Sequence, residues 1–210
     1  MTQSQPQENI KITLIGGTGV GKTCIIKRLT DGSFDPDSNS TMGGSYSVKM
    51  LKIDQEEVKC DIWDTAGQEK YRSLGQLFYK DAYIVCLVYS INNKKTFEDM
   101  KEKWYPDLKQ YGEKYQVLGV VANKSDMFEE EEVNEDEGRQ YAATINAKFF
   151  LVSAKTGDGI DAMFKALVQE YLGPDFKKKV KEMKEEKGEV QKLDDKDFKP
   201  TVEKKKKKCC

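Results

Sequence analysis

Gly16-Gly17-Thr18-Gly19-Val20-Gly21-Lys22-Thr23 is a glycine-rich stretch that lies between two apolar segments. The preceding run, Ile10 to Ile15, is typical of a buried strand, and in the following run, Cys24 to Leu29, apolar residues recur at helical spacing. A strand, a loop with the G-x-x-x-x-G-K-[ST] pattern and a helix together predict a phosphate-binding loop. An ordinary glycine turn is the simpler alternative, but it does not account for the whole pattern with both flanks in place.

The residues of this loop each have a chemical use. Glycines let backbone N–H groups turn inward around an anion, and the helix that starts near Gly21 adds its positive N-terminal end. Lys22 can place a positive charge on the β- and γ-phosphates of a nucleotide, and Thr23 offers a hydroxyl to Mg²⁺. We therefore expect a nucleotide with Mg²⁺ to bind here.

Length and composition limit the class of protein. The 210 residues, 38% of them hydrophobic, predict one domain with a tail. No window approaches 18 consecutive apolar residues, so no transmembrane helix is predicted, and polar residues 1–9 lack the apolar region of a signal peptide. Cys24, Cys60 and Cys86 are interpreted as reduced core residues, and the sequence, which has no His, shows no disulfide framework or zinc pattern. These features favour the cytosol.

The charge is distributed unevenly along the chain. The net charge is −1, but residues 177–210 contain 14 Lys against 8 acidic residues, which leaves −7 for the rest. An acidic body argues against a nucleic-acid partner. Lysines 204–208, directly before Cys209 and Cys210, indicate a membrane anchor of two lipids with adjacent positive charge. For residues 177–199 alone, a merely solvated tail is an equally good interpretation.

Strand-like and helix-like segments alternate along the chain. We predict strands at residues 10–15, 45–53, 58–63, 84–89, 117–122 and 149–152. We predict helices ending near residue 30 and over residues 96–111, 138–147 and 161–172, with a hairpin turn at 54–56, an acidic loop at 129–137 and a possible kink at Pro106. This alternation predicts a parallel sheet with helices on both faces.

Four polar motifs, at residues 16–23, 64–69, 123–126 and 153–155, each follow a predicted strand. In parallel sheets, ligands bind at the carboxyl ends of the strands. We therefore expect all four motifs to converge on one edge of the sheet and to build a single nucleotide site.

The motif Asp64-Thr65-Ala66-Gly67-Gln68 ends a predicted strand, which is the usual place for the acid that holds Mg²⁺. We expect Asp64 to hold the ion directly or through water, and the Gly67 N–H to face a γ-phosphate. Gln68 can orient a water molecule, although it is too weak a base to deprotonate one. A simple polar turn is the alternative for this motif taken alone.

The motif Asn123-Lys124-Ser125-Asp126 predicts a guanine pocket. The Asp126 carboxylate can accept hydrogen bonds from guanine N1–H and the 2-amino group, whereas adenine lacks both donors and would leave the carboxylate unpaired. Lys124 can lay its stem along the ring, Asn123 can tie this loop to the phosphate loop, and the Ala154 N–H can reach the guanine carbonyl oxygen. The pattern is weak alone but specific after a buried strand, about 100 residues beyond a phosphate loop.

GGTGVGKT, Thr41, WDTAGQE, NKSD and SAK, in this order and spacing, resemble the Ras superfamily of small GTPases over about residues 8–172. Residues 64–82, the long charged tail and the terminal Cys-Cys are similar to the Rab family of membrane-traffic GTPases. The resemblance implies an α/β fold of the P-loop NTPase small G domain type over residues 8–173. Its sheet would be mostly parallel and six-stranded, with one antiparallel strand and about five helices on both faces. A flexible lysine-rich tail, residues 174–210, would follow.

The resemblance also implies roles for individual residues. Thr41 corresponds to the switch threonine that reaches Mg²⁺ and the γ-phosphate, and Phe34 to the aromatic residue that packs near the guanine. The implied nucleotide-binding residues are Gly17, Thr18, Gly19, Val20, Gly21, Lys22, Thr23, Cys24, Phe34, Thr41, Gly67, Asn123, Lys124, Asp126, Ser153, Ala154 and Lys155. The implied metal ligands are Thr23, Thr41 and Asp64, the catalytic residues Gln68, Lys22, Thr41 and Gly67, and the effector-binding aromatic triad Tyr46, Trp63 and Phe78.

The sequence departs from the family after the switch threonine. Rabs usually continue with Ile-Gly-Val-Asp-Phe, whereas this chain has Met42-Gly43-Gly44-Ser45-Tyr46. Gly44 adds backbone freedom and Ser45 removes a charge, which bears on the identity of effectors rather than on nucleotide binding. Thr18 stands where many Ras-like proteins have Gly, and Rabs often carry a small hydroxyl residue there.

The implied function is slow hydrolysis of GTP to GDP and phosphate by a molecular switch in vesicle traffic. No arginine occupies a recognisable in-cis catalytic position, so we expect turnover on the order of 10⁻⁴ to 10⁻³ s⁻¹, as in Ras. The implied partners are an exchange factor, an activating protein, effectors, a GDP dissociation inhibitor and a prenyltransferase with its escort protein. The protein would be a monomer on the cytoplasmic face of an intracellular membrane, prenylated at Cys209 and Cys210, and cycling with the cytosol.

Two other classes of function stay open at this point. A non-hydrolysing guanine-nucleotide-binding interaction protein would share the pocket, but the presence of Gln68 disfavours it. An ATP-dependent kinase or ATPase would share the phosphate loop, but it predicts no Asn-Lys-x-Asp motif.

Overall fold

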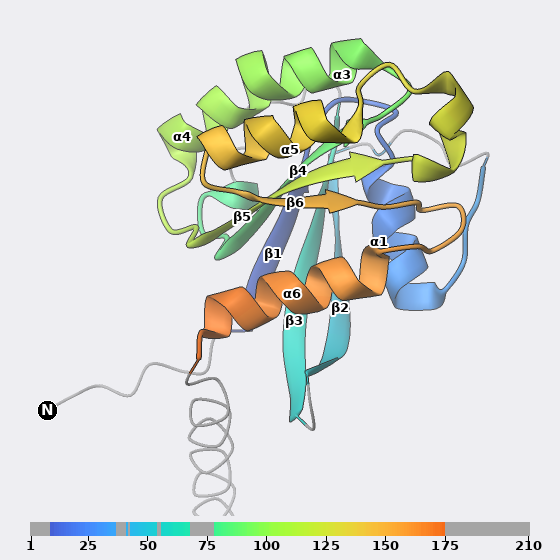
Figure 1. The fold of residues 1–210 in the computed structure, drawn as a ribbon. Helices are drawn as coiled ribbons and strands as arrows, with labels where there is room; N and C mark the ends of the chain where they lie inside the picture. The colour runs from blue at the N-terminus through green and yellow to red at the C-terminus, as the bar shows by residue number, and fades with distance from the viewer. Residues whose placement is uncertain (1–8, 37–40, 42, 54–55, 68–77, 175–210) are drawn as a thin grey trace, which may run out of the picture. The chain divides into compact units, whose positions relative to one another are not determined.

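The fold was analysed in a computed structural model that describes residues 9–36, 41, 43–53, 56–67 and 78–174. In these residues, six strands form one sheet in the order β2-β3-β1-β4-β5-β6 (Figure 1). β2 runs antiparallel to β3, and every other neighbouring pair is parallel. The prediction of a mostly parallel α/β sheet with one antiparallel strand is confirmed.

The elements of this part of the chain follow one another as β1 (Ile10–Ile15), α1 (Lys22–Asp31), β2 (Gly44–Ile53), β3 (Glu56–Thr65), β4 (Ile84–Ser90), α3 (Lys94–Asp99), a π-helical turn (Met100–Trp104), α4 (Tyr105–Tyr111), β5 (Val117–Asn123), a 3₁₀ helix (Ser125–Glu130), α5 (Glu135–Thr144), β6 (Lys148–Leu151) and α6 (Ile160–Leu172). α1 and α6 cover one face of the sheet, and α3, α4 and α5 cover the other (Figure 1). The predicted hairpin lies between β2 and β3, and its residues 54–55 are outside the described part.

The neighbouring interior strands β4 and β5 are buried along their whole length. Their continuous apolar sequences fit strands that are covered by helices on both faces. On the α3–α5 side, Phe97, Met100, Trp104 and Leu108, which were predicted to form one helical stripe, are all buried in the core. Burial of this stripe holds the helices against the face of the sheet, so they do not cover the ends of the strands.

The helix predicted over residues 96–111 is interrupted, and Pro106 supplies the physical reason. α3 ends at Asp99, a π-helical turn follows, and Pro106 lies in the first turn of α4. Pro106 has no N–H to donate, so the regular hydrogen-bond pattern cannot continue through it, and a wider turn directly before it changes that pattern. The expected kink therefore takes the form of a π-helical turn.

The acidic loop predicted at residues 129–137 is shorter in the structure. Its first residues belong to the 3₁₀ helix that ends at Glu130, and α5 begins at Glu135 rather than near residue 138. The Asn134 side chain accepts the Glu137 backbone N–H at 2.9 Å, and acidic residues fill the first turn of α5. This cap and these charges stabilise an earlier helix start than hydrophobic periodicity alone indicates.

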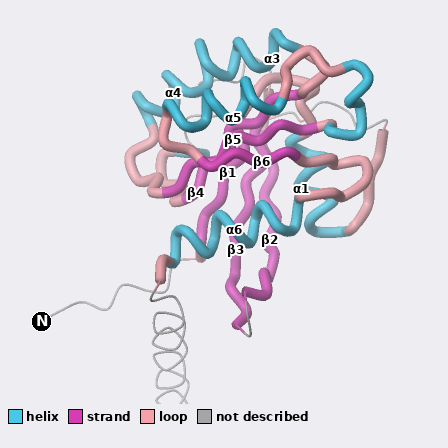
Figure 2. Tube along the Cα trace, viewed as in Figure 1, coloured by secondary structure: helices cyan, strands magenta, loops and turns pink. Residues whose placement is uncertain are grey.

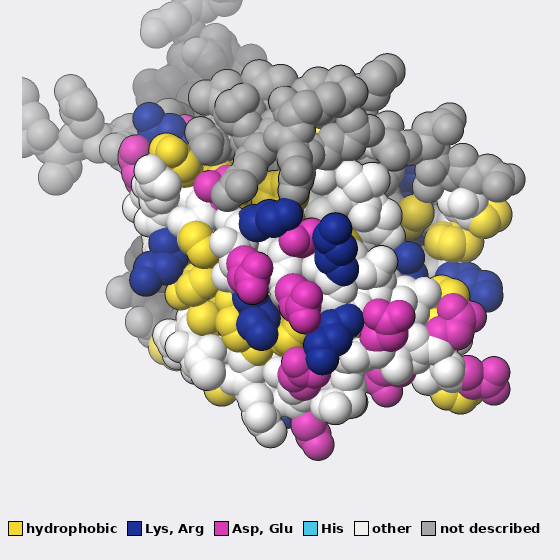
Figure 3. Space-filling model, turned by 90° about the horizontal axis from the view of Figure 1, so that it is seen from above, with side chains coloured by type: hydrophobic (Ala, Val, Ile, Leu, Met, Phe, Trp, Pro, Cys, Tyr) yellow, Lys and Arg dark blue, Asp and Glu magenta, His cyan; other side chains and the backbone are white. Residues whose placement is uncertain are grey.

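The loops that follow β5 and β6 lie on the same side of the molecule as α1, and so form one end of the sheet (Figure 2). On the outer face over α3, α4 and α5, Lys and Arg side chains are interspersed with Asp and Glu, as in the Lys103–Asp99 and Arg139–Glu135 ion pairs (Figure 3). None of the helices in the described ranges has the length and apolar character that crossing a bilayer requires. Residues 175–210 of the predicted tail, with Cys209 and Cys210, lie outside these ranges, and the domain boundary at residue 173 stays a prediction.

Candidate functional site

The four motifs converge on one cavity of about 480 Å³ at the carboxyl ends of the strands. The residues expected at a nucleotide that line it are Thr18, Gly19, Gly21, Lys22, Thr23, Cys24, Phe34, Thr41, Gly67, Asn123, Lys124, Asp126, Ala154 and Lys155. A cavity of this size and composition, built from segments far apart in the sequence, is typical of a small-molecule site.

Three of the expected nucleotide-binding residues do not line the cavity but support its wall. The Gly17 carbonyl accepts a hydrogen bond from Lys22, the Val20 carbonyl accepts one from Asn123, and buried Ser153 donates one to Asp126. The expected metal ligand Asp64 is not a lining residue either, although Thr23 and Thr41, which bond to it, both are. The cavity also has lining residues that the sequence analysis missed, namely Asp35, Pro36, Thr65 and Met127. Each lies within two positions of an expected residue, and closeness in the sequence was the signal that could have found them.

Lys22 is a buried cation held by the backbone of its own loop. Its ammonium donates to the Gly16 carbonyl at 2.8 Å and to the Gly17 carbonyl at 3.0 Å, and the residue is 6% exposed. Burial lowers the pKa of Lys22 from 10.5 to about 8, and the negative charge of Asp64 opposes this change. The ammonium is thus positioned for an anion in the cavity before any anion binds.

Three oxygen-bearing side chains meet next to this lysine. The Thr23 hydroxyl donates to Asp64 Oδ2 at 2.6 Å, the Thr41 hydroxyl donates to the same oxygen at 3.0 Å, and the two hydroxyl oxygens are 2.6 Å apart. The other carboxylate oxygen, Asp64 Oδ1, is buried and has no hydrogen-bond partner among the described residues. An unpaired buried carboxylate oxygen is costly unless a further group satisfies it.

This oxygen cluster fits Mg²⁺. The ion prefers oxygen ligands, and it is usually held by one or two carboxylates together with water and substrate phosphates. Among the described residues, no group of three or more His, Cys, Asp or Glu is placed to hold a metal ion. One carboxylate beside two hydroxyls therefore matches a site that the nucleotide itself would complete.

Gly67 brings the end of β3 against the phosphate loop. A β-carbon at this position would lie 2.5 Å from the Gly17 carbonyl group and 2.6 Å from the Thr18 nitrogen. Contacts this short do not occur in real structures, so only glycine allows the two backbones to approach so closely. The Gly67 N–H thereby stays near the place expected for the terminal phosphate.

Asn123 joins the phosphate loop to the loop after β6. Its side-chain amide donates to the Val20 carbonyl at 2.7 Å, and its Oδ1 accepts the Ala154 N–H at 3.1 Å. The Ala154 N–H, which was expected to reach a guanine carbonyl oxygen, is therefore engaged within the protein here. A base in the cavity would share this donor with Asn123 or replace it.

Asp126 is oriented by the loop after β6. The Ser153 hydroxyl donates to its Oδ1 at 2.6 Å, and the Lys155 ammonium lies 3.7 Å from its Oδ2. Lys124 adopts a left-handed backbone conformation with φ of 69° directly before the 3₁₀ helix that carries Asp126. The Asp126 carboxylate is thus oriented by Ser153, and Asp126 also lines the cavity.

Arg28 on α1 is a supporting residue that the sequence analysis did not identify. Its guanidinium donates to the Ala154 carbonyl at 2.9 Å, the Lys155 carbonyl at 2.6 Å and the Gly32 carbonyl at 2.6 Å. These bonds attach the loop after β6 to the helix that begins at the phosphate loop. Because all three acceptors are backbone oxygens, no side-chain pattern in the sequence signals the contact.

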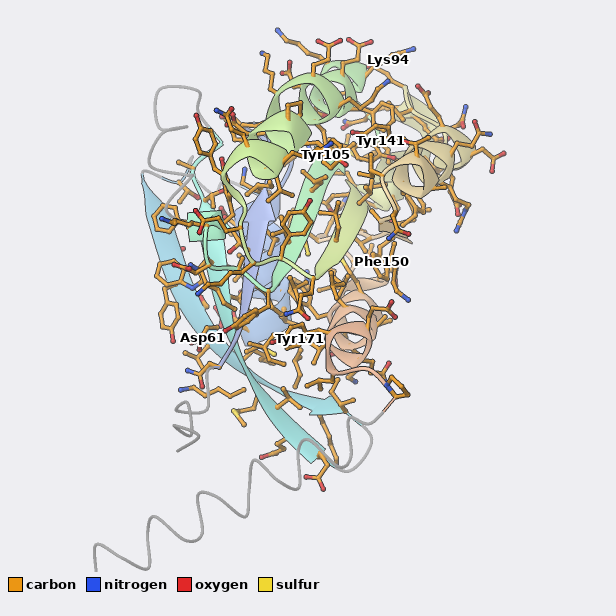
Figure 4. The ribbon with its side chains drawn as sticks, turned by 90° about the vertical axis from the view of Figure 1, so that its left-hand side faces the viewer. Asp61, Lys94, Tyr105, Tyr141, Phe150 and Tyr171 are labelled. Carbon is orange, nitrogen blue, oxygen red and sulfur yellow. The ribbon has the colours of Figure 1, made fainter. Side chains whose placement is uncertain are left out.

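The aromatic surface, defined by Tyr46, Trp63 and Phe78, contributes no residue to the lining of the cavity. The Trp63 ring centroid is 5.1 Å from that of Tyr46 and 5.4 Å from that of Phe78. The Tyr46 hydroxyl donates to Asp61 Oδ1 at 3.0 Å, and Figure 4 shows Asp61 on the β2–β3 side of the molecule. Tyr46 is 48% exposed at the edge of the sheet, so this surface is available to a partner.

The structure leaves two groups of expected residues untested. Gln68, the water-orienting residue, and the lipid-bearing Cys209 and Cys210 are outside the described residues. Their roles stay predictions.

Comparison with known proteins identifies the family. The sequence pattern of the Ras family matches residues 11–173. The chain is 38% identical to Ras-related protein RabC of Dictyostelium discoideum over 162 residues, which cover 76% of this chain and 82% of that protein. It is 36% identical to human Ras-related protein Rab-30 over 154 residues (73% of this chain, 75% of that protein) and 38% identical to human Rab-22A over 155 residues (74% and 79%). The chain belongs to the Rab family of small GTPases within the Ras superfamily, which bind guanine nucleotides and hydrolyse GTP.

Proposed function

We propose that the 480 Å³ cavity is the Mg²⁺·GTP site of this Rab-family protein and that the bound nucleotide sets a switch in vesicle traffic. The observation that carries the proposal is that the Thr23 and Thr41 hydroxyls both donate to one oxygen of the buried Asp64 carboxylate. Its other oxygen has no hydrogen-bond partner among the described residues. These residues come from α1, the segment before β2 and the end of β3. A γ-phosphate and its metal would therefore tie three separate segments together, and hydrolysis would release them.

Within this proposal, the base is selected by Asp126. Its carboxylate, held by Ser153, accepts from guanine N1–H and the 2-amino group, and adenine cannot supply these donors. The remaining nucleotide contacts follow the wall of the cavity, with Phe34 and Lys124 against the base and residues 17–24 around the phosphates. The Lys22 ammonium compensates the phosphate charge.

Hydrolysis in this proposal depends on position rather than on a strong base. Lys22 stabilises charge that develops on the phosphates, the Gly67 N–H and Thr41 orient the terminal phosphate, and Gln68 orients the attacking water. Mg²⁺ would add positive charge where the leaving oxygens become negative. No arginine is among the described residues that line the cavity, so an activating protein supplies the missing charge.

A competition experiment tests the nucleotide assignment. The full chain, loaded with a fluorescent GDP analogue in Mg²⁺ buffer, is mixed with excess GTP, GDP or ATP. We expect GTP and GDP to displace the analogue at concentrations at least a thousandfold lower than ATP. Equal displacement by ATP and GTP would show that Asp126 does not select the base. Single-turnover phosphate release with and without a Rab-activating protein then separates a GTPase from a non-hydrolysing binding protein.

The tail and the partners complete the proposal. Cys209 and Cys210 carry two geranylgeranyl groups added by a prenyltransferase with its escort protein, and lysines 204–208 add attraction to an anionic cytoplasmic leaflet. Cycling between membrane and cytosol then requires a carrier, a GDP dissociation inhibitor, that hides both lipids. Mass spectrometry of the membrane-bound protein from its own cells tests this part, since unmodified cysteines there would contradict it.

A further inference from the structure

Gly44 is the first residue of β2 and is exposed to solvent, at a position where Rabs usually carry Val. Glycine is unfavourable in strands because it has no side chain to pack and loses more freedom on folding. The backbone does not require it here, because Gly44 is not among the residues with positive φ, whereas its neighbour Gly43 has φ of 80°. Gly43 therefore adopts the left-handed conformation that favours glycine, whereas the presence of glycine at position 44 has another cause.

The explanation is space for an aromatic ring. A β-carbon on Gly44 would lie 2.6 Å from Phe78 Cζ and 2.8 Å from Phe78 Cε2, and 3.1 Å from the Asp64 carbonyl oxygen. The first two distances are shorter than real β-carbon contacts, so the Phe78 ring occupies the volume that a side chain at position 44 would take. An aromatic ring packed over a glycine at a sheet edge compensates for the missing side chain.

The Phe78 backbone is held in place. Its carbonyl oxygen accepts a hydrogen bond from Thr13 Oγ1 at 3.0 Å, and the next residue, Tyr79, is 1% exposed in the core. A side chain at position 44 could therefore be accommodated only by turning the ring and not by moving the chain. The ring lies 5.4 Å from Trp63, so turning it would also change the packing of Trp63.

We propose that Gly44 is a positioning residue for partner selection, because it lets Phe78 lie over the start of β2 and so sets the shape of the aromatic surface. The proposal rests on the proposed function, in which effectors contact this surface. The fitting partner presents apolar side chains to the Phe78 ring and has no basic residue opposite Ser45, where Rabs usually carry Asp. With Val at position 44 this chain could not keep the same surface, because a β-carbon there and the Phe78 ring in its present position exclude each other.

A double-mutant cycle tests the contact itself. The free energy of unfolding is measured for the wild type, Gly44→Val, Phe78→Ala and the double variant, all loaded with GDP and Mg²⁺. We expect Gly44→Val to destabilise the wild type and to lose most of this effect in the Phe78→Ala background. Ser45→Asp is the matched control, since it enlarges the side chain at the next exposed position, which points to the opposite face of the strand from position 44. The same effect of Gly44→Val in both backgrounds would overturn the proposal.

Trp63 fluorescence reports the position of the ring. The chain has two Trp residues, so Trp104→Phe leaves Trp63 as the sole emitter. We expect Gly44→Val to raise the acrylamide quenching constant of Trp63 about twofold, because turning Phe78 uncovers the indole, and Gly44→Ala to give a smaller change in the same direction. Ser45→Asp should leave it unchanged. If Trp104→Phe does not fold, the quenching difference between Gly44→Val and Ser45→Asp in the full chain replaces it. Equal quenching in all variants would contradict the proposal.

Binding measurements separate partner selection from packing. The probe is a purified effector domain of a Rab that carries Val at this position, and that Rab is the positive control. With a non-hydrolysable GTP analogue bound, we expect Gly44→Val to bind the domain at least tenfold more tightly than the wild type, at unchanged nucleotide affinity. If the double-mutant cycle shows the Gly44–Phe78 contact but Gly44→Val does not change effector binding, Gly44 acts only in packing and its role in partner selection is refuted. Loss of GTP binding by the wild type would instead refute the proposed function, and the cycle would still report the contact.

Discussion

The charged side chains of Lys22 and Asp126 each have an environment that changes a property that can be measured. Lys22 is buried, with a pKa lowered to about 8, and Asp126 has one oxygen occupied by Ser153 before any base arrives. Lys22 is held by hydrogen bonds to the backbone of its own loop and Asp126 by one from the loop after β6, so the energy of each charge depends on what else enters the cavity. Substitution and pH can therefore test them one at a time.

The lowered pKa of Lys22 predicts proton uptake when a nucleotide binds. Above about pH 8 the folded, nucleotide-free protein has lost a proton that the unfolded chain keeps up to 10.5. The stability of the empty protein should therefore rise with pH between these values through this group. Bound phosphates favour the charged form, so the affinity for GDP should fall as the pH rises through this window. The heat of GDP binding near pH 8.5 should differ between two buffers of different ionisation enthalpy, because the buffer supplies the proton that Lys22 takes up. Near pH 7.5 this difference between buffers should be smaller. Identical heats near pH 8.5 would contradict the assignment.

Substitution Asp126→Asn should change base preference. The Ser153 hydroxyl can keep its bond to the remaining side-chain oxygen, which turns the new amide N–H₂ toward the base. Two donors would then face guanine N1–H and the 2-amino group, and affinity for GTP should fall about a hundredfold or more. Xanthine has a 2-carbonyl that accepts from the amide, so xanthosine triphosphate should gain. Asp161→Asn, at an exposed position of α6, is the control and should leave both affinities unchanged in a competition assay.

Among the helices and strands, features set by neighbouring residues could be predicted from the sequence, whereas contacts between residues far apart in the chain could not. The β1–loop–α1 unit follows from a continuous run of sequence, because its glycines, lysine and apolar flanks act on their near neighbours. The break in the helix over residues 96–111 depends on how the chain passes Pro106, and periodicity does not contain that information. The Arg28 contacts and the Phe78–Gly44 contact join positions far apart in the chain, so nothing near either residue indicates them.

The caps of α3 and α5 allow a matched test of helix stability. Both helices have Asn at the N-cap, but only the Asn134 side chain accepts a backbone N–H, while Asn93 makes no side-chain cap hydrogen bond. We expect Asn134→Ala to cost about 1 kcal/mol of unfolding free energy and to lower Tm by about 2–4 °C. Asn93→Ala should cost clearly less in the same thermal unfolding experiment. Equal losses for the two variants would refute the role of the Asn134 cap.

Two tyrosines in the core should respond in opposite ways to loss of the hydroxyl. The Tyr89 hydroxyl is buried between β4 and α5 and finds no hydrogen-bond partner in the part of the chain that the structure describes, and burial raises the pKa of this side chain. Tyr89→Phe removes an unsatisfied polar group and should leave stability unchanged or raise it by about 1 kcal/mol. Tyr79 donates to Asp107 at 3.5 Å, so Tyr79→Phe should destabilise the protein. Denaturant unfolding of both variants decides this, and a large loss of stability in Tyr89→Phe would show that its hydroxyl has a partner.

For the whole molecule, the nucleotide is expected to act as a structural component. The cavity draws its wall from five segments at one end of the sheet, and the Asn123–Val20 bond alone joins residues 103 positions apart. A ligand in this cavity therefore restrains segments spread over most of the described chain. Binding of this kind stabilises the folded state in proportion to the logarithm of ligand concentration over Kd.

Thermal unfolding should show this linkage directly. At about a thousandfold excess of GDP over Kd in Mg²⁺ buffer, stabilisation of about 4 kcal/mol should raise Tm on the order of 10 °C above the nucleotide-free protein. A chelator that removes Mg²⁺ should reverse most of the gain, and ATP at the same concentration should give little of it. A Tm that does not respond to GDP and Mg²⁺ would be inconsistent with the cavity as the nucleotide site.

The Arg28 contacts also have a consequence for protein synthesis. Arg28 donates to the Ala154 carbonyl, 126 positions later in the chain, so the contact cannot form until the ribosome has made that segment. At about 5–20 residues per second, translation of this interval takes roughly 6–25 s. During that time the phosphate loop exists without the loop that supports Asp126, and the nascent chain cannot hold a nucleotide by its base. The newly made protein should therefore acquire its first nucleotide only near the end of translation, from the pool present in the cell at that moment.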